Sequence, residues 1–328
     1  MLRMPEFEVH LPKTHAEAVH LRSNLPDAMY VAGGTDLLPN LKHQLHTPKH
    51  LVSLQHLEGF SGIDQRDSAI VIGAGTPLQT VADSSEIQRL FPGLSQAAAS
   101  VAGPQHRRMG TLGGNVMLDT RCLFYNQSLP WRQALGFCLK KDGDWCHVVG
   151  SKATCVAAQS SDTVPMLIAL GASVRFEDTS GSSLLSLEEL FEQDGRYESV
   201  HATSATALLT EISIPMPFPG QRSVYRKVRQ RQAIDFPQLG IGIASSFEND
   251  VCTSLRAVVG ALMPRPRMLK GMERAVGRPW DDALIADLAQ ECFQQVRPQR
   301  NLQGDPAWRR QLAKVEMERG LRALLASS

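Results

Sequence analysis

The sequence predicts a soluble chain of two domains that mix helices and strands. Its 328 residues correspond to roughly two domains, and 43% hydrophobic with 20% charged residues is the balance of a fully folded protein. Helical and strand-like patterns alternate along the chain, and a cluster of prolines with Gly220, between residues 215 and 220, is the best candidate for a linker. These features exclude a disordered or fibrous protein.

Charge and hydropathy exclude several classes of partner. Lysine plus arginine number 34 against 33 aspartate plus glutamate, and a net charge of +1 is too small for a general attraction to nucleic acid or anionic lipid. The longest apolar stretch, residues 164–174, is about half the ~20 residues that span a bilayer, and the N-terminus lacks the apolar region of a secretory signal. We therefore expect a cytoplasmic protein with no membrane or nucleic-acid partner.

The first forty residues predict a helix, a strand and a second helix. Thr14 and Glu17 form a capping box that opens the first helix, and a short strand at 28–31 runs into a Gly-Gly-Thr-Asp segment, residues 33–36. The second helix then begins at Leu37. Consecutive glycines between a strand and a helix let the backbone turn its N–H groups inward, which is typical of a phosphate-binding nest.

A second glycine-rich segment follows a run of short elements. We expect strands at 51–54 and 69–72, and helices opened by Thr76 as N-cap, by Ser84 and by Pro92. Residues 103–115 then form a loop that ends in Thr-Leu-Gly-Gly-Asn. Two such loops could hold the two phosphates of a dinucleotide, although neither matches a P-loop or a Rossmann fingerprint.

The remaining chain divides into an irregular segment and a regular one. Residues 116–161 show little periodicity and are too long for a bare loop, so something other than a packed core must order them. Regular patterns resume afterwards. They predict strands at 173–176, 208–214, 223–229, 239–247 and 255–262, and helices at 166–170 and near 187–191, 268–276, 281–296 and 307–325.

Several segments resemble a known family. Val31-Ala-Gly-Gly-Thr-Asp-Leu37, Thr111-Leu-Gly-Gly-Asn115, Asp162 with Pro165, and Tyr225-Arg-Lys-Val-Arg229 are similar, in order and spacing, to the FAD-binding subunits of the molybdenum hydroxylases. This is the group of the xanthine dehydrogenase and carbon monoxide dehydrogenase flavoproteins, and the resemblance covers nearly the whole chain. It implies an α+β fold, with a two-subdomain FAD-binding (PCMH-type) portion over 1–217 and a C-terminal α+β domain of the CO dehydrogenase flavoprotein type over 222–328.

The resemblance also implies which residues bind FAD, and it places no catalytic residue on this chain. Tyr30 to Leu37 resembles the loop on the pyrophosphate, and Thr111 to Asn115 resembles the second phosphate loop. Val101 lies near the cofactor, Asp162 bonds it, Leu209 is a main-chain contact and Lys227 lies near the flavin. The implied residues are Tyr30, Val31, Ala32, Gly33, Gly34, Thr35, Asp36, Leu37, Val101, Thr111, Leu112, Gly113, Gly114, Asn115, Asp162, Leu209 and Lys227.

The irregular segment departs from the wider family. Asn115 and Asp162 are 47 positions apart, several times the usual span, so residues of about 116–161 are an insertion. Four thiolates are the ligand set of a 4Fe-4S cluster or a structural zinc ion, and the insertion holds four cysteines, Cys122, Cys138, Cys146 and Cys155. Zinc ribbons use C-x2-4-C pairs, which are absent here, so zinc is the weaker alternative. A third alternative is that the four cysteines are buried but bind nothing.

The insertion has a closer resemblance of its own. Gly103-Pro-Gln-His-Arg107, Asp119-Thr-Arg-Cys-Leu-Phe-Tyr-Asn-Gln-Ser128, Phe137-Cys-Leu-Lys140 and Asp144-Trp-Cys-His-Val148 are similar to the β subunits of 4-hydroxybenzoyl-CoA reductases, the branch with an additional 4Fe-4S cluster. The resemblance implies Cys122, Cys138, Cys146 and Cys155 as the ligands of that cluster. Cys252 and Cys292, in apolar contexts elsewhere, are expected in the core.

The function implied is an electron relay. Electrons would pass from a ferredoxin-like donor through the 4Fe-4S cluster and FAD to the 2Fe-2S clusters of a small subunit and the molybdenum cofactor of a large subunit, in a dimer of heterotrimers. Reductive removal of the phenolic hydroxyl of 4-hydroxybenzoyl-CoA, in anaerobic aromatic degradation, would occur on the large subunit. The alternatives are a hydroxylase flavoprotein subunit that passes electrons outward to an external acceptor, and a non-redox scaffold with structural zinc.

Overall fold

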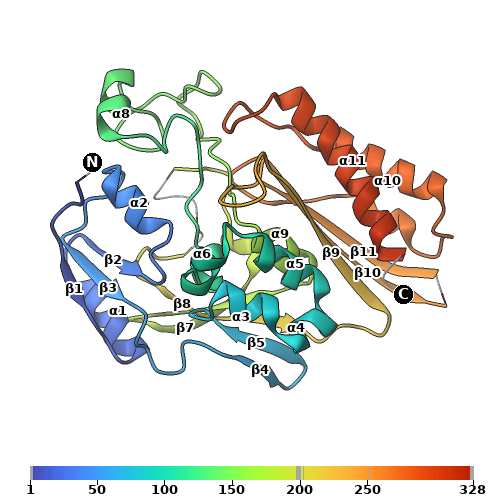
Figure 1. The fold of residues 1–328 in the computed structure, drawn as a ribbon, viewed down its shortest axis with the longest axis horizontal. Coiled ribbons are helices and arrows are strands. Elements are labelled where there is room, and N and C mark those ends of the chain that lie inside the picture. The colour runs from blue at the N-terminus through green and yellow to red at the C-terminus, as the bar shows by residue number, and fades with distance from the viewer. Residues whose placement is uncertain (1–2, 197–200, 202, 250, 326–328) are drawn as a thin grey trace.

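Three β-sheets organise the chain in the computed structural model, which describes residues 3–196, 201, 203–249 and 251–325 (Figure 1). The three sheets have the strand orders β1-β3-β2, β4-β5-β8-β6-β7 and β12-β11-β10-β9. Only the first sheet is parallel. The α+β class predicted from the sequence is confirmed.

The first sheet is small and has helices beside it. Its elements are β1 (Glu8–His10), α1 (His15–Asn24), β2 (Ala28–Val31), α2 (Leu37–Lys42) and β3 (His50–Ser53). The hydroxyl of Thr14 accepts a hydrogen bond from the backbone N–H of Glu17, so the predicted N-cap of α1 is confirmed. Ala18 and Val19 on α1 pack with Val52 of β3 in the main hydrophobic core.

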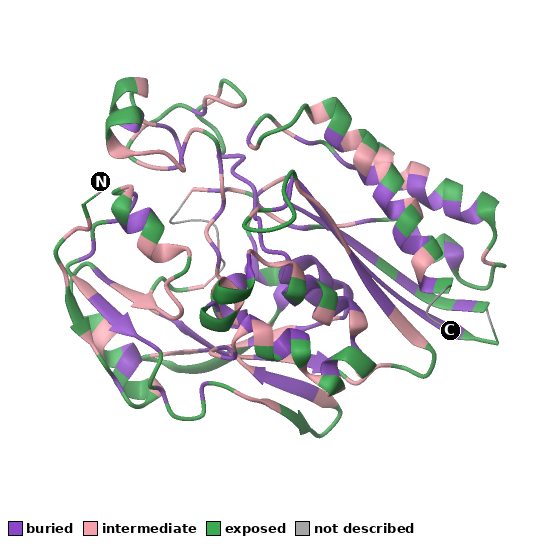
Figure 2. Ribbon diagram, viewed as in Figure 1, coloured by how far each residue is buried: buried purple, intermediate pink, exposed green. Residues whose placement is uncertain are grey.

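The second sheet carries short helices that pack against one another. Its strands and helices are β4 (Ile63–Arg66), β5 (Ala69–Gly73), α3 (Leu78–Asp83), α4 (Ser85–Leu90), α5 (Pro92–Ser100), α6 (Pro104–Met109), α7 (Leu112–Val116), α9 (Thr163–Ala169), β6 (Ser173–Asp178), β7 (Gly181–Ser186), the 3-10 helix η1 (Leu187–Leu190) and β8 (Leu208–Pro215). Every residue of α9 is buried, because this helix packs against the third sheet and against α5 and α7; the purple segments of Figure 2 mark such buried residues.

The third sheet lies beyond the proline cluster. It comprises β9 (Gln221–Val228), β10 (Leu239–Glu248), β11 (Val251–Gly260) and β12 (Arg267–Met268), followed by the 3-10 helix η2 (Met272–Ala275), α10 (Asp282–Gln295) and α11 (Pro306–Leu325). In Figure 1, α10 and α11 cover one face of this sheet, while α5 and α9 pack on the other. Cys252 and Cys292 are fully buried in the core of this unit, as expected.

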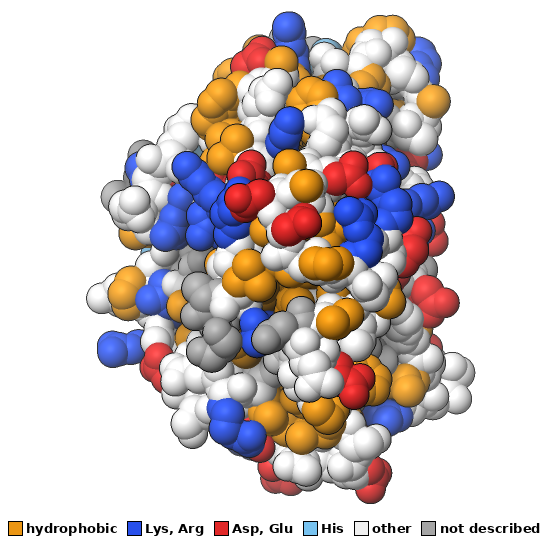
Figure 3. Space-filling model, turned by 90° about the vertical axis from the view of Figure 1, so that its right-hand side faces the viewer, with side chains coloured by type: hydrophobic (Ala, Val, Ile, Leu, Met, Phe, Trp, Pro, Cys, Tyr) orange, Lys and Arg blue, Asp and Glu red, His pale blue; other side chains and the backbone are white. Residues whose placement is uncertain are grey.

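Ion pairs cover the outer face of the third unit. Arg274 lies 2.7 Å from Glu291, and Arg322 lies 3.1 Å from Glu318. Figure 3 shows that face, where acidic and basic side chains are interspersed. This pattern agrees with the balanced charge of the sequence. No helix in the described ranges is long and apolar enough to cross a membrane.

Four local expectations were wrong. Thr76 does not cap α3, because its hydroxyl donates to the carbonyl of Gly62. Strands β4 and β7 form where no strand was predicted. The helix expected near 268–276 is reduced to the 3-10 helix η2, because β12 ends at Met268 and Gly271 takes a left-handed φ of 79° before η2. The segment 103–115, expected as a loop, contains α6 and α7.

The insertion forms a third, separate packing unit. Within residues 116–161 there is one helix, α8 (Leu129–Leu135), and the rest is irregular. A small hydrophobic cluster holds Leu45, Tyr125, Leu139, Val156 and Ala157 together with all four cysteines. The insertion is therefore ordered around its cysteines.

Candidate functional site

The two glycine-rich loops touch each other. A Cβ built on Gly33 would lie 1.8 Å from the carbonyl oxygen of Met109, so only glycine lets the first loop approach the backbone before the second. Gly34 has a φ of 68°, which turns the chain toward α2. Gly33 and Gly34 are half-buried and Thr35 is exposed, so this loop stays accessible to a ligand.

The second loop is held by its own hydrogen bonds. The hydroxyl of Thr111 accepts from the N–H of Gly114 at 3.0 Å. The N–H of Gly113 donates to the carbonyl of Ala74 at 2.8 Å, where any side chain on residue 113 would collide with Ala74. Gly114 is exposed beside the buried Leu112 and Gly113. In each pair one glycine, Gly33 or Gly113, is used for close packing, and Gly114 of the second pair is exposed.

Asn115 joins this loop to the start of α9. Its Oδ1 accepts from the hydroxyls of Ser161, at 2.6 Å, and Thr163, at 2.8 Å. All three residues are buried. Asn115 thus connects the glycine loop to the residues on either side of Asp162, 47 positions away in sequence.

Asp162 and Lys227 form a buried ion pair. Nζ of Lys227 lies 2.7 Å from Oδ2 of Asp162, and the hydroxyl of Tyr225 donates to Oδ1 at 2.8 Å. The side chains of Asp162 and Lys227 are each 4% exposed. Burial raises the pKa of Asp162 and lowers the pKa of Lys227. Each partner is therefore held charged mainly by the other.

The backbone next to Val101 closes this group. Ser100 offers its carbonyl to Nζ of Lys227, at 3.0 Å, and to Nη1 of Arg229, at 2.9 Å. Val101 is half-buried at the end of α5, and its own carbonyl accepts from Arg107. Ser100, which precedes Val101, thus contacts Lys227, and Lys227 in turn pairs with Asp162.

The outer members of the predicted set lie on strands. Tyr30, on β2, donates its hydroxyl to the carbonyl of Thr206 at 2.9 Å. Leu209, on β8, is buried next to Thr210, whose carbonyl accepts from the N–H of Ala74. The carbonyl of Ala74 also accepts a hydrogen bond from the N–H of Gly113. Ala74 therefore connects the strand that carries Leu209 to the second loop. The predicted residues therefore share one region of the fold.

The four cysteines of the insertion line one cavity. Cys122, Cys138, Cys146 and Cys155 surround it, with Phe124, Leu139, Lys140, His147, Val148 and Ala157 completing the wall. All four cysteines are free thiols and buried. The N–H of Ala157 donates to Sγ of Cys155 at 3.5 Å. The wall is mostly apolar, with Lys140 and His147 as its polar members.

The pKa values and positions of these thiols are relevant to whether they bind a metal ion or an iron-sulfur cluster. Burial and the neighbouring cysteines raise the pKa of Cys122 to about 12, and burial raises that of Cys155 to about 11. A metal that binds these thiols must displace their protons. Within the described chain, no three of the sulfur atoms lie within 4.8 Å of one another. A single tetrahedral zinc ion would hold its sulfur ligands about 3.8 Å apart.

A buried ion pair supports the cavity wall. Nζ of Lys140 donates to Oδ1 of Asp119 and to the hydroxyl of Thr120, each at 2.7 Å, and the Lys140 side chain is 1% exposed. The same ammonium lies 4.6 Å from the centre of the Tyr125 ring. One positive charge is therefore fixed beside the sulfur atoms.

The insertion is anchored to both larger units. Nη2 of Arg132, on α8, donates to the carbonyl of Gln44 at 2.7 Å, and α8 lies above α2 in Figure 1. On the other side the N–H of Leu123 donates to the carbonyl of Asn301. The side-chain amide of Asn301 in turn bonds the carbonyls of Val156 and Leu262. These bonds fix the cysteine cavity relative to the glycine loops.

Three residues of this region were not predicted from sequence. Arg121 bonds Asp36, Tyr225 bonds Asp162, and Lys140 lines the cysteine cavity. All three residues stand in segments that carry the family resemblance, but their partners are far away in sequence. His46 is also buried beside Tyr125, at 3.4 Å, and burial lowers its pKa to about 4.

The residues present fit both groups that the sequence implies. For FAD, two touching glycine turns, one half-buried and one with Gly114 exposed, can offer backbone N–H groups to a pyrophosphate. The only carboxylate in the first loop is that of Asp36, which Arg121 neutralises. For an iron-sulfur cluster, four buried thiols converge on one mostly apolar cavity.

Comparison with known proteins places the chain among flavoproteins. Residues 5–217 match the family described as the FAD binding domain in molybdopterin dehydrogenase, and residues 223–324 match the CO dehydrogenase flavoprotein C-terminal domain. The carbon monoxide dehydrogenase medium chain of Hydrogenophaga pseudoflava is 25% identical over 324 residues, 98% of each chain. The aldehyde oxidoreductase FAD-binding subunit PaoB of Escherichia coli (strain K12) is 29% identical over 271 residues, 80% of this chain and 83% of PaoB.

Solved structures share the fold over the full length. A carbon monoxide dehydrogenase from Hydrogenophaga pseudoflava that lacks the Mo-pyranopterin moiety superposes with a TM-score of 0.80 at 23% identity, covering 99% of each chain. Quinoline 2-oxidoreductase from Pseudomonas putida 86 superposes with a TM-score of 0.79 at 20% identity, again over 99% of each chain. At these identities the likeness establishes the fold alone.

Proposed function

Because this chain belongs to the FAD-binding medium subunits of the molybdenum hydroxylase family, we propose that it works as an electron relay with two redox groups, FAD and a 4Fe-4S cluster. FAD exchanges electrons singly or in pairs, and a 4Fe-4S cluster exchanges them singly, so the two together connect one-electron and two-electron partners. The chain's own residues bind, orient and shield these groups. Substrate chemistry belongs to a partner subunit.

The glycine loops and the buried ion pair are the proposed FAD site. Residues 30–37 and 111–115 supply backbone N–H groups to the pyrophosphate, in a domain of residues 1–217 that is followed by a second of residues 222–328. Lys227 is held in place by Asp162 and by the carbonyl of Ser100, at 2.7 and 3.0 Å, so its ammonium is a fixed positive charge. A fixed cation favours the anionic forms of a neighbouring cofactor. Val101 and Leu209 complete the proposed contacts.

The four cysteines are the proposed ligands of the cluster. The observation that carries this proposal is that Cys122, Cys138, Cys146 and Cys155, spread over 34 residues without a short Cys pair, converge on one buried cavity. The lack of a short Cys pair in the sequence favours a cluster over a single zinc ion, and the mostly apolar wall and the amide of Ala157 suit an iron-sulfur group. Lys140 then compensates part of the negative charge of the ligated thiolates.

For the complete enzyme we propose a 4-hydroxybenzoyl-CoA reductase-like assembly in the cytoplasm. It would contain a molybdenum large subunit and a 2Fe-2S small subunit as a dimer of heterotrimers, and a ferredoxin-like donor would supply electrons for the reductive dehydroxylation to benzoyl-CoA. The support is the insertion with its cysteine cavity, because a further one-electron centre suits a one-electron donor. Arg121, which adjoins Cys122 and bonds Asp36, connects that cavity to the first glycine loop.

A second candidate is a hydroxylase subunit that passes electrons outward. Its support is that the relatives described above include a carbon monoxide dehydrogenase medium chain and an aldehyde oxidoreductase subunit. In this case the partners would be the same two kinds of subunit, with an external electron acceptor in place of the ferredoxin-like donor.

Cofactor analysis tests the relay directly. The chain is purified anaerobically with co-expressed partners, and flavin, iron, acid-labile sulfide and zinc are measured for wild type, Cys138→Ser and Cys252→Ser. We expect FAD and one 4Fe-4S cluster per chain, loss of the cluster but not of FAD in Cys138→Ser, and no loss in Cys252→Ser, whose cysteine lies in the third unit. FAD without iron, or zinc in its place, would contradict the cluster.

Reduction of the flavin by different donors then separates the two candidates. Reduced ferredoxin and NADH are mixed with the anaerobic holoenzyme, and the bleaching of the flavin absorbance is followed. Rapid reduction by ferredoxin that slows in Cys138→Ser supports inward electron flow through the cluster. Equal rates in wild type and Cys138→Ser favour the outward hydroxylase.

A further inference from the structure

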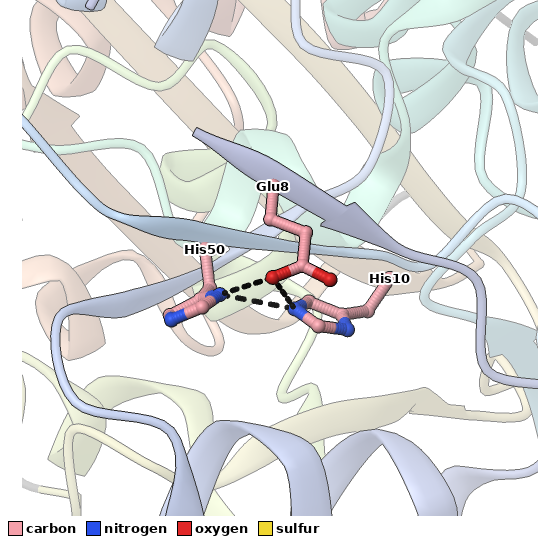
Figure 4. Close-up of side chains that lie close together, drawn as sticks. All are labelled: Glu8, His10 and His50. Carbon is pink, nitrogen blue, oxygen red and sulfur yellow. Dashed lines mark hydrogen bonds and ion pairs between the residues drawn. The ribbon is translucent and has the colours of Figure 1, made fainter. Parts of the chain in front are cut away.

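Two histidines and a glutamate meet at the edge of the first sheet, and none of the three is among the residues proposed to hold the redox groups. Glu8 and His10 are two residues apart on β1, so their side chains leave the same face of the sheet. In the parallel pairing of β1 with β3, His50 lies opposite Glu8. The three side chains therefore converge, as Figure 4 shows.

The three ligand atoms have the spacing of a metal site. Nε2 of His10 lies 3.1 Å from Nδ1 of His50, and Oε2 of Glu8 lies 3.9 Å from the first nitrogen and 3.4 Å from the second. A point equidistant from these atoms lies about 2.0 Å from each, which is the length of a zinc–nitrogen or zinc–oxygen bond. Within the described ranges this is the one group of three such residues whose ligand atoms all lie within 4.8 Å.

The position of the site in the sheet explains how it is held. On β3, His50 and Val52 point to the same face of the sheet, and His50 lies opposite Ala28 of β2. Val52 and Ala28 both belong to the main hydrophobic core. The two imidazoles are 19% exposed each, whereas the carboxylate of Glu8 is 68% exposed. The sheet thus fixes the nitrogen ligands at the margin of the core and leaves an approach from solvent.

We infer that Glu8, His10 and His50 bind one divalent ion of the zinc type, independently of the proposed redox function. Two imidazoles and one carboxylate are a common three-ligand set for zinc, with water in the fourth position. Imidazole ligands also disfavour calcium and magnesium, which take oxygen. Because β1 has only three residues and pairs only with β3, the ion links the edge strand to the sheet.

Zinc binding to the intact cofactor-loaded chain tests the site. Bound zinc is measured by equilibrium dialysis and elemental analysis in wild type, in Glu8→Gln, His10→Ala and His50→Ala, and in His56→Ala, an exposed histidine outside the group. The same measurement in Cys138→Ser separates this site from the thiols. We expect one site in wild type, His56→Ala and Cys138→Ser. Each ligand variant should bind at least about ten-fold more weakly, since loss even of outer partners costs 10–100-fold.

Two further readouts keep the test decisive. Copper added as a probe below one equivalent should show hyperfine coupling to two nitrogens by electron paramagnetic resonance in wild type and to one in His10→Ala. Zinc should raise the melting temperature of wild type and not of Glu8→Gln, whose exposed side chain leaves the fold intact. Equal zinc binding in all histidine variants, or binding that only Cys138→Ser removes, would overturn the inference.

Discussion

Nη1 of Arg121 lies 3.1 Å from Oδ1 of Asp36, and this ion pair joins the cysteine-bearing insertion to the first glycine-rich loop. The guanidinium of Arg121 also lies over the ring of Phe236, 3.7 Å from its centre. Burial raises the pKa of Asp36, and Arg121 opposes that rise. Since Arg121 is bonded in sequence to Cys122, any movement of the loop is coupled to the wall of the cysteine cavity.

The Arg121–Asp36 pair should show a measurable coupling in a double-mutant cycle. We expect the single variants Asp36→Asn and Arg121→Gln to weaken FAD retention, and the pair to contribute about 1 kcal/mol, because both side chains are partly exposed. Thermal unfolding and flavin content of the two single variants and the double variant provide the cycle. Strictly additive effects would mean that the contact does not connect the two segments energetically.

Gly33→Ala should separate the two glycine loops. The new Cβ would lie 1.8 Å from the carbonyl oxygen of Met109, so the backbones must move apart, at a cost of about 1–3 kcal/mol. We expect a lower melting temperature and a low flavin-to-protein ratio. Gly103→Ala is the matched control, because its Cβ meets nothing closer than 3.5 Å. Equal flavin content in the two variants would argue against a tight contact between the loops.

Lys227→Met should make stability depend on pH in a defined direction. The variant leaves the carboxylate of Asp162 buried without its cation, at a cost of about 3–5 kcal/mol near neutral pH. Burial already raises the pKa of Asp162, and Lys227 lowers it, so the variant raises it further. The folded variant then holds a proton that the unfolded chain has released.

The stability of Lys227→Met relative to wild type should therefore be greatest at acid pH. The free energy of unfolding of the variant, relative to that of wild type, then falls as the pH rises through the raised pKa of Asp162. Melting temperatures of both proteins from about pH 5 to pH 8 measure this difference. Lys49→Met, at an exposed pair with Asp27, is the control and should follow wild type. A gap between variant and wild type that is constant with pH would refute the assignment to Asp162.

Lys140→Met should affect both the stability of the insertion and its redox group. The side chain is 1% exposed and bonded to Asp119, so its removal should cost about 3–5 kcal/mol. Removal of a positive charge beside the thiolates should also lower the reduction potential of the cluster, which a potentiometric titration followed by electron paramagnetic resonance measures. Lys152→Met, at an exposed pair in the same insertion, should change neither quantity. An unchanged potential in Lys140→Met would place the cluster elsewhere.

Many helices and strands were predicted correctly from residues that are close together in sequence. The N-cap Thr14, the strand at 28–31 and the helix after Leu37 depend on neighbours within a few residues, and all three are present. Strand β7 was missed because Gly181–Ser186 is mostly exposed and polar, and only its pairing with β6 makes it a strand. Thr76 was misassigned because its partner, Gly62, is 14 residues away.

The sequence by itself determined the class of the fold, the two glycine-rich loops and the presence of four thiols in one insertion, because each of these depends on residue type and short spacing. Only the tertiary structure decided that the loops touch at Gly33, that Lys227 meets Asp162, and that the four cysteines share one cavity. It also decided the meeting of His50 with Glu8, which depends on strand register. Contacts between distant residues follow from how the sheets and helices pack, and no local pattern encodes that packing.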